Sequence, residues 1–346
     1  MAPRSENKSD ADDIIGYECY QRKCCNRDLN HDDGDSQNVC CSSSTCCETT
    51  LAHVKDDLVT LRAKITLTAH EEWSTVSYSQ SPSWLKGTPY LLANHRPQLK
   101  SYRVAFKSIF RWHTETLNIW SHGLGAIFFG YLGWQFFGSL EHMPATISNV
   151  DWWMTFAWFF GQVCCCSLST IYHTFNCHSS HIGLSLVKCD YIGIFASCWS
   201  TLITAGYFCF YCDQMTRMAW YAVAGCVLIV GPFMVMTENN SYRCAIYAAV
   251  VCPNIIAFLS ALKELIVFHP TLVWPSLKCL LGTYGFPSIG ALIYLNKVPE
   301  KLCPGLFDLI GHSHQLMHLL VLCCMYSQYE LLLIATRLRF YGSCDT

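Results

Sequence analysis

Long apolar runs alternate with short polar stretches from residue 119 to the end of the chain. Each run is close to the roughly twenty residues that an α-helix needs to cross about 30 Å of hydrocarbon. None of the runs has the polar face expected of a helix in a soluble bundle. The pattern predicts an all-α membrane protein with seven transmembrane helices. The predicted spans are residues 119–138, 152–172, 191–211, 218–236, 244–262, 273–295 and 310–334.

The composition divides the rest of the chain into segments. Residues 1–70 are polar, of mixed charge and rich in cysteine, which predicts a disordered cytosolic tail. Residues 71–117 form a lead-in, and its segment 100–111 repeats basic residues every three or four positions. That spacing is typical of an amphipathic helix on an anionic membrane surface. We expect the transmembrane domain over 118–336 and a short extracytosolic tail over 337–346.

The charge and cysteine content narrow the class of protein further. Charged residues make up 14% of the chain, against about 25% in soluble domains, which supports a membrane protein. The net charge is -2, and we expect no nucleic-acid partner. Seven cysteines lie between Cys19 and Cys47 without the paired spacing of a zinc ribbon. We interpret them as reduced cytosolic thiols, with palmitoylation or adventitious metal binding as alternatives.

The distribution of lysine and arginine predicts the orientation in the membrane. Basic residues crowd the segment before the first span, whereas the next loop, residues 139–151, has none. Because basic residues favour the cytosolic side, we place the N-terminus in the cytosol and the C-terminus on the far side. Arg217, Arg337 and Arg339 fall against this rule. The sequon at Asn239 is then cytosolic and should not be glycosylated.

This orientation brings three histidines to one depth of the membrane. His173 ends the second span, and His314 and His318 lie in the first turns of the seventh, all on the cytosolic side. His314 and His318 are four residues apart, so they share one helix face. Three histidines with one open position are the ligand set of a catalytic type of zinc site. The alternative is that each is an ordinary polar residue at a span end. His312 lies two residues from His314, so it points elsewhere, and we interpret it as a loop residue.

Two further polar residues lie near the histidines in this arrangement. Asp190 begins the third span, where it could move protons for an activated water or simply cap the helix. Ser169 precedes His173 by one helical turn. Its hydroxyl could hydrogen-bond to a metal-bound water or to Asp190, or it could bond to a carbonyl of its own helix. The segment HTETLNIWSH, from His113 to His122, has two interpretations. It could form a polar network near the metal site, but we favour capping of the first span.

Several stretches together resemble the progestin and adipoQ receptor family, and most closely its adiponectin receptors. They are PSWLKGTPYLLANHRP, FKSIFRWHTETLNIWSHGLG, SLSTIYHTFNCHS, KCDYIGI, VPEKLCPGLFD and SHQLMH, in this order. The resemblance implies seven helices, a cytosolic N-terminus and a zinc ion near the cytosolic side. Its motif positions for the zinc ligands are His173, His314 and His318, and those near the zinc are Ser169 and Asp190. Leu117 and the cysteine-rich tail depart from the family pattern.

The resemblance also implies a function. The family is associated with receptors of the plasma membrane that signal through lipid metabolism, with ceramidase-type hydrolysis as the activity. Zinc would polarise an amide carbonyl, Asp190 would move protons, and Ser169 would orient the water. The implied partners are ceramide or a free fatty acid, an extracellular protein hormone, and a cytosolic adaptor at the N-terminal region. The alternative is a non-catalytic receptor or Golgi adaptor with structural zinc.

Overall fold

The computed structural model describes residues 73–139, 147–236 and 265–341, together with positions 255, 256, 259 and 262. Several predictions lie outside these residues. They are the disordered tail at 1–70, the sequon at Asn239 and nearly all of the fifth predicted span, 244–262.

The described residues form helices and no strand. Six of the helices have the length of a membrane span, and each overlaps one of the predicted runs. They are α4 (Thr116–Ser139), α5 (Asn149–Phe175), α6 (Ser180–Cys209), α7 (Gln214–Met236), α9 (Pro270–Asn296) and α10 (Ser313–Tyr341). Among the described residues, three helices are long and apolar enough by themselves to cross a membrane, namely α5, α6 and α10.

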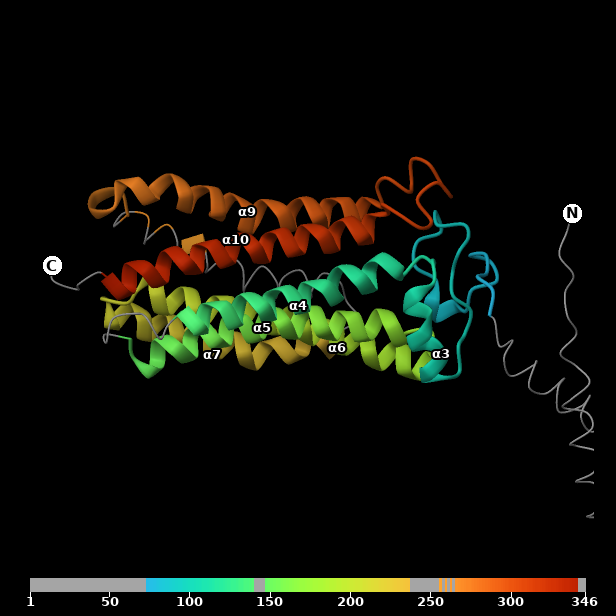
Figure 1. The fold of residues 1–346 in the computed structure, drawn as a ribbon, viewed down its shortest axis with the longest axis horizontal. Coiled ribbons are helices and arrows are strands. Elements are labelled where there is room, and N and C mark those ends of the chain that lie inside the picture. The colour runs from blue at the N-terminus through green and yellow to red at the C-terminus, as the bar shows by residue number, and fades with distance from the viewer. Residues whose placement is uncertain are drawn as a thin grey trace, which may run out of the picture. The chain divides into compact units, whose positions relative to one another are not determined.

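The long helices lie side by side along one axis (Figure 1). Helix α5 packs between α4 and α6, α7 packs on α6, and α9 packs on α10, which also contacts α4 and α6. Large apolar side chains such as Trp134, Ile127 and Leu281 are exposed on the outside of this bundle. An apolar surface of this extent is unfavourable in water and suits lipid.

Small residues and paired polar groups join the helices in the interior. A Cβ atom added at Gly206 of α6 would collide with the indole of Trp220 on α7, so glycine permits that close approach. Ser197 of α6 donates to Gln162 of α5 at 2.6 Å, and Thr201 of α6 donates to Gln328 of α10 at 3.2 Å. These bonds satisfy polar groups that have no water available in a membrane.

A buried ion pair joins three helices at the end where α5 begins and α10 ends. Asp151 is fully buried and accepts hydrogen bonds from Tyr207 of α6 at 2.8 Å and from Arg339 of α10 at 3.2 Å. Asp151 also completes a capping box with Ser148 at the start of α5. Helix α10 continues to Tyr341, past residue 336, where the transmembrane domain was predicted to end.

The lead-in lies at the opposite end of the bundle (Figure 1). It contains the short helices η1 (Ser83–Leu85), α3 (Tyr102–Lys107) and η2 (Ser108–Phe110), and an isolated bridge joins Val76 to His95. The helix predicted over 100–111 is thus shorter and ends in a 3-10 turn. Its aromatic residues Tyr102, Phe106 and Phe110 are exposed, as suits a membrane interface.

Candidate metal centre

Three histidines from two distant helices converge beside the lead-in. His173 lies in the last turn of α5, and His314 and His318 lie in the first two turns of α10. One ring nitrogen from each lies within 4.8 Å of the others, and the Nε2 atoms of His173 and His314 are 3.3 Å apart. His173 and His318 are buried and His314 is half-buried. The cluster could therefore hold a metal ion.

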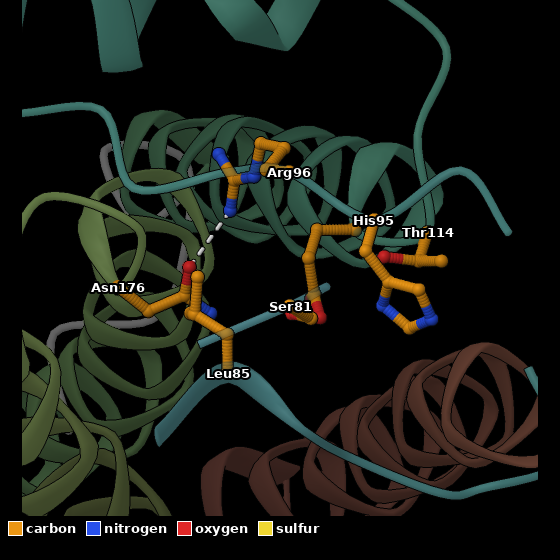
Figure 2. Close-up of a pocket in the computed structure, with 7 residues that line it drawn as sticks. Ser81, Leu85, His95, Arg96, Thr114 and Asn176 are labelled. Carbon is orange, nitrogen blue, oxygen red and sulfur yellow. Dashed lines mark hydrogen bonds between the residues drawn. The ribbon is translucent and has the colours of Figure 1, made fainter. Parts of the chain in front are cut away.

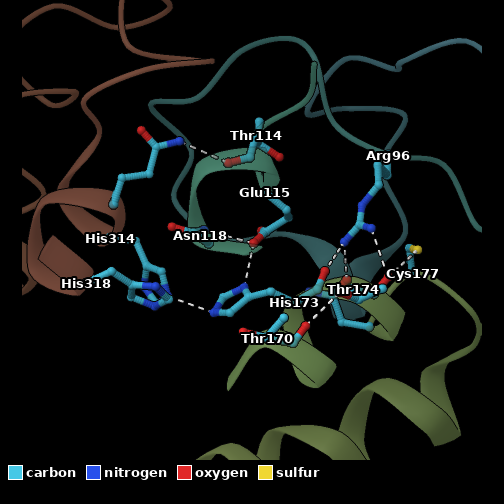
Figure 3. A network of polar contacts seen from close by, with 12 residues as sticks. Arg96, Thr114, Glu115, Asn118, Thr170, His173, Thr174, Cys177, His314 and His318 are labelled. Carbon is cyan, nitrogen blue, oxygen red and sulfur yellow. Dashed lines mark hydrogen bonds and ion pairs between the residues drawn. The ribbon is translucent and has the colours of Figure 1, made fainter. Parts of the chain in front are cut away.

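The ring of His173 is oriented by a carboxylate. Its Nδ1 atom donates to Glu115 Oε2 at 2.6 Å, and Asn118 donates to the same oxygen at 2.9 Å. This bond leaves Nε2 of His173 facing the other histidines (Figure 3). A carboxylate behind a ligating histidine is the usual arrangement at protein metal sites. Glu115 is thus part of a polar network at the site, and our preferred interpretation of HTETLNIWSH as span-end capping was wrong for this residue.

The charge of Glu115 is maintained by its surroundings. Burial acts to raise the pKa of its carboxyl group, but attraction to His173 and hydrogen bonds from His173 and Asn118 oppose this, with a further contribution from Arg96. The net result is a pKa well below the usual range. The carboxylate is therefore ionised at neutral pH and accepts the His173 proton as a charged partner.

Helix α4 also contacts the second buried histidine. Ser121 lies 3.4 Å from Nδ1 of His318, and the ring of His122 stacks on that of His318 with centroids 3.8 Å apart. Both nitrogens of the buried His122 lack a hydrogen-bond partner within the described part of the chain. The first turns of α4 thus orient histidines from both α5 and α10.

His312 does not join the cluster. It lies directly before α10, and its Nε2 atom is 3.0 Å from the carbonyl oxygen of Thr114. Gln315 in the first turn of α10 donates to the same oxygen at 3.3 Å. His312 is therefore the loop residue that the sequence indicated, and it fastens α10 to the residues that precede α4.

Asp190 lies deeper in its helix than predicted. Helix α6 begins at Ser180, where the side chain of Ser179 caps it, so Asp190 is ten residues inside the helix and does not cap it. Its carboxyl group interacts electrostatically with His173 and lies next to the hydroxyl of Ser169. Ser169 is buried and makes no bond to its own helix. The two residues therefore face one another beside the histidine cluster.

The donor chemistry fits a transition metal. Three imidazoles suit zinc, copper, iron or nickel, and the partners of His173 and His318 leave one nitrogen of each ring for an ion. The residues define the class of ion rather than its identity.

Comparison with known protein families identifies the chain. Residues 110–329, well over half of the chain, match the family model described as haemolysin-III related. The chain belongs to the haemolysin-III related family. The match includes the three histidines, Glu115, Ser169 and Asp190, and it ends before the last turns of α10. Since the family is a membrane family, the chain is an integral membrane protein.

Individual proteins that are similar to the chain agree with the resemblance seen in the sequence. The chain is 31% identical over 268 residues to a Drosophila melanogaster protein named adiponectin receptor protein. It is 30% identical over 284 residues to progestin and adipoQ receptor-like protein 1 of Caenorhabditis elegans. It is 30% identical over 293 residues to heptahelical transmembrane protein 1 of Arabidopsis thaliana. These matches confirm the predicted family.

The matches differ in how much of each protein they cover. They take in 75%, 80% and 78% of this chain, respectively. The chain spans 59% of the fly protein and 64% of the nematode protein, but 83% of the plant protein.

The sequence indicated some of the residues that support the site but not others. Glu115 and His122 lie in the polar stretch HTETLNIWSH, for which a polar network near the metal site was one of the two interpretations. Arg96 is one of several basic residues that precede the first span, and nothing in its local sequence distinguishes it from the others. Its role depends on contacts with residues about eighty positions away, and no local pattern predicts them.

Proposed function

We propose that this protein is a seven-helix membrane receptor with a zinc-dependent amide hydrolase site that acts on ceramide. Its N-terminus would lie in the cytosol, and its output would be a lipid product. The observation that carries the proposal is the convergence of His173, His314 and His318, with their ligand atoms within 4.8 Å of one another. A site of three imidazoles and one open position is typical of catalytic rather than structural zinc.

Three observations support the proposed topology. The six described helices of span length need only one more, and the run at 244–262 has the required composition. Cys212, in the link between α6 and α7, is disulfide-bonded. Disulfides persist in oxidising compartments, which supports an extracytosolic position for this link. In that orientation the histidines at the other end of α5 would lie on the cytosolic side. The relative in Arabidopsis thaliana is named heptahelical.

The residues around the histidines have the chemistry that amide hydrolysis needs. A zinc ion held there would polarise the amide carbonyl and lower the pKa of water. Asp190 would take a proton from the attacking water and return it to the leaving amine. Ser169, whose hydroxyl lies next to the Asp190 carboxyl group, would orient the water beside it. Glu115 holds the His173 ring in the orientation that directs Nε2 at the site.

The substrate and partners follow from the membrane setting. A site near one end of a lipid-facing bundle suits an amide that is itself a lipid, which can enter between helices. We propose ceramide as substrate and a free fatty acid as product, with a protein hormone acting from outside. The N-terminal region would contact a cytosolic adaptor, and the compartment would be the plasma membrane rather than the Golgi.

Ceramide hydrolysis by purified protein tests the proposal, with zinc content measured on every sample. The variants are His314→Ala, which removes a ligand, and Asp190→Asn, which replaces the proton-accepting carboxylate with an amide of nearly the same shape. We expect His314→Ala to lose both zinc and turnover, and Asp190→Asn to keep zinc but lose turnover by about 100-fold or more. Wild-type protein that holds zinc without turnover would overturn the hydrolase assignment and favour a structural role for the metal.

A further inference from the structure

The lead-in contains a short segment, residues 90–96, that contacts two regions next to the histidine cluster: the last turn of α5, which carries His173, and the loop that precedes α10. We call residues 90–96 the strap. At one end, Arg96 reaches the last turn of α5, where His173 lies; at the other, Tyr90 and Leu92 contact the loop that leads into α10. We propose that the strap is a positioning element, and that Arg96 and Asp308 set the affinity of the site for metal without touching the ion. This inference rests on the proposed metal site.

Arg96 fixes the backbone of the ligand-bearing turn of α5. It is buried, and its guanidinium donates to the carbonyl oxygens of His173 and Thr174, to the side chain of Asn176 and to Ser108. The bond to Thr174 is 2.9 Å long and that to Asn176 is 2.8 Å long. A cation at this position also interacts favourably with the C-terminal end of the helix. His173 is thus held through its backbone by Arg96 and through its ring by Glu115 (Figure 3).

A single carboxylate holds the other end of the strap. Asp308 accepts hydrogen bonds from the backbone N–H groups of Leu92 at 2.9 Å and Ala93 at 2.8 Å. Gly305 donates to the carbonyl oxygen of Tyr90 at 3.0 Å. The loop that contains Asp308 is fastened in turn to α10, because Glu300 accepts from the backbone N–H of Ser313 at 2.8 Å. The position of His314, the next residue, is therefore linked to the strap.

The backbone in the middle of the strap turns at Asn94 and is held by hydrogen bonds to neighbouring segments. Asn94 adopts a left-handed backbone conformation with φ of 64°, which asparagine tolerates better than most residues. Its carbonyl oxygen accepts from Thr114 at 3.0 Å, and His95 pairs with Val76 through two backbone bonds. A small pocket beside Arg96 is lined by strap residues and by Thr114, Glu115 and Asn176 (Figure 2). The strap thus joins the ends of α5, α4 and α10.

Residues that orient metal ligands typically change metal affinity by 10–100-fold when they are mutated. We therefore expect Arg96→Lys and Asp308→Asn each to weaken zinc affinity by about 10-fold. Lysine keeps the charge of Arg96 but cannot hold several acceptors in one plane. Asparagine keeps the shape of Asp308 but leaves one oxygen for two N–H groups.

Matched substitutions at the other end of the bundle are the controls. Arg339→Lys alters an arginine that is paired with a buried aspartate, and Asp213→Asn alters an aspartate that also accepts a backbone N–H, that of Thr216, at 3.0 Å. Zinc affinity is measured by competition with a fluorescent chelator on full-length protein in detergent. The melting temperature of the metal-free form is recorded for each variant.

The strap proposal requires weaker zinc binding in Arg96→Lys and Asp308→Asn and unchanged binding in the controls. If the strap variants only melt earlier and bind zinc as the wild type does, the strap is purely structural and the proposal is wrong. If Arg96→Lys yields no folded protein, the zinc affinity of Asp308→Asn tests the proposal alone. We expect this variant to fold, because its amide oxygen still accepts one backbone N–H. If instead His173→Ala binds zinc as tightly as wild type, the metal site itself is wrong, and the strap proposal fails with it.

Discussion

Replacing Glu115 by glutamine should weaken zinc binding while the three ligands remain in place. The Glu115 carboxylate accepts a hydrogen bond of 2.6 Å from Nδ1 of His173. The side chains of His173 and Glu115 are 3% and 27% exposed, respectively, so water replaces this bond poorly. Glutamine keeps the length of the side chain and one acceptor oxygen but removes the charge. The variant therefore isolates the effect of the carboxylate on the ligating ring.

Two estimates of the effect agree. A hydrogen bond to a charged group contributes about 1.5–3 kcal/mol. Loss of the group that orients a ligating histidine typically weakens metal affinity by about 10–100-fold, which corresponds to about 1.4–2.7 kcal/mol. Because Asn118 competes for the remaining oxygen, we expect a loss of roughly 30-fold, near the middle of that range.

Competition with a chelator of known affinity measures this change directly. Glu330→Gln is the matched control, because Glu330 lies on α10 twelve residues beyond His318, about 18 Å along the helix. The control should bind zinc as the wild type does. Wild-type affinity in Glu115→Gln would refute the inference that Glu115 orients His173 for a metal.

Three further results are expected. Burial and the nearby Arg96 guanidinium lower the pKa of His113 from its ordinary value of 6.5 to about 3. Only the unfolded chain takes up this proton as the pH falls below 6.5, so His113 should lower the free energy of unfolding by about 2 kcal/mol between neutral pH and pH 5. His113→Gln should therefore show a smaller acid-induced drop in melting temperature. Asp151→Asn removes the buried negative charge with which Arg339 pairs and should lower the free energy of unfolding by about 3 kcal/mol. Zinc content should stay unchanged, because this ion pair lies at the other end of the bundle from the histidine cluster; a loss of zinc would contradict that expectation. A chelator should lower the melting temperature of the wild type but not that of His318→Ala, because zinc stabilises only a fold that binds it; equal shifts in both would contradict His318 as a ligand.

The sequence predicted the long helices well because the membrane imposes a simple rule on them. The apolar runs at 119–138 and 152–172 lie within α4 and α5, which extend only a few residues further at each end. The third run was less informative, because α6 starts eleven residues before residue 191. Hydropathy marks where a helix enters lipid, whereas the helix itself begins where a residue such as Ser179 caps it. This difference explains why Asp190 was wrongly expected as a possible cap.

The three histidines of the candidate site could be predicted from the sequence, because all three lie at the same end of the bundle. The i, i+4 spacing placed His314 and His318 on one face, and the membrane orientation brought His173 to the same end of the bundle. The supporting residues could not be found in this way. Glu115 and His173 are separated by 58 residues, and Leu92 and Asp308 by 216 residues. Such pairings arise from the packing of whole helices and loops, which no local spacing encodes.

Zinc content per chain is the measurement that tests the central claim most directly. Purified wild type should contain about one zinc, and His173→Ala, His314→Ala and His318→Ala should contain almost none. His178→Ala is the control, since this histidine stacks on Tyr102, outside the three-histidine cluster, and its loss should leave zinc in place. Retention of wild-type zinc by the three cluster variants would contradict the assignment of these histidines as the metal ligands.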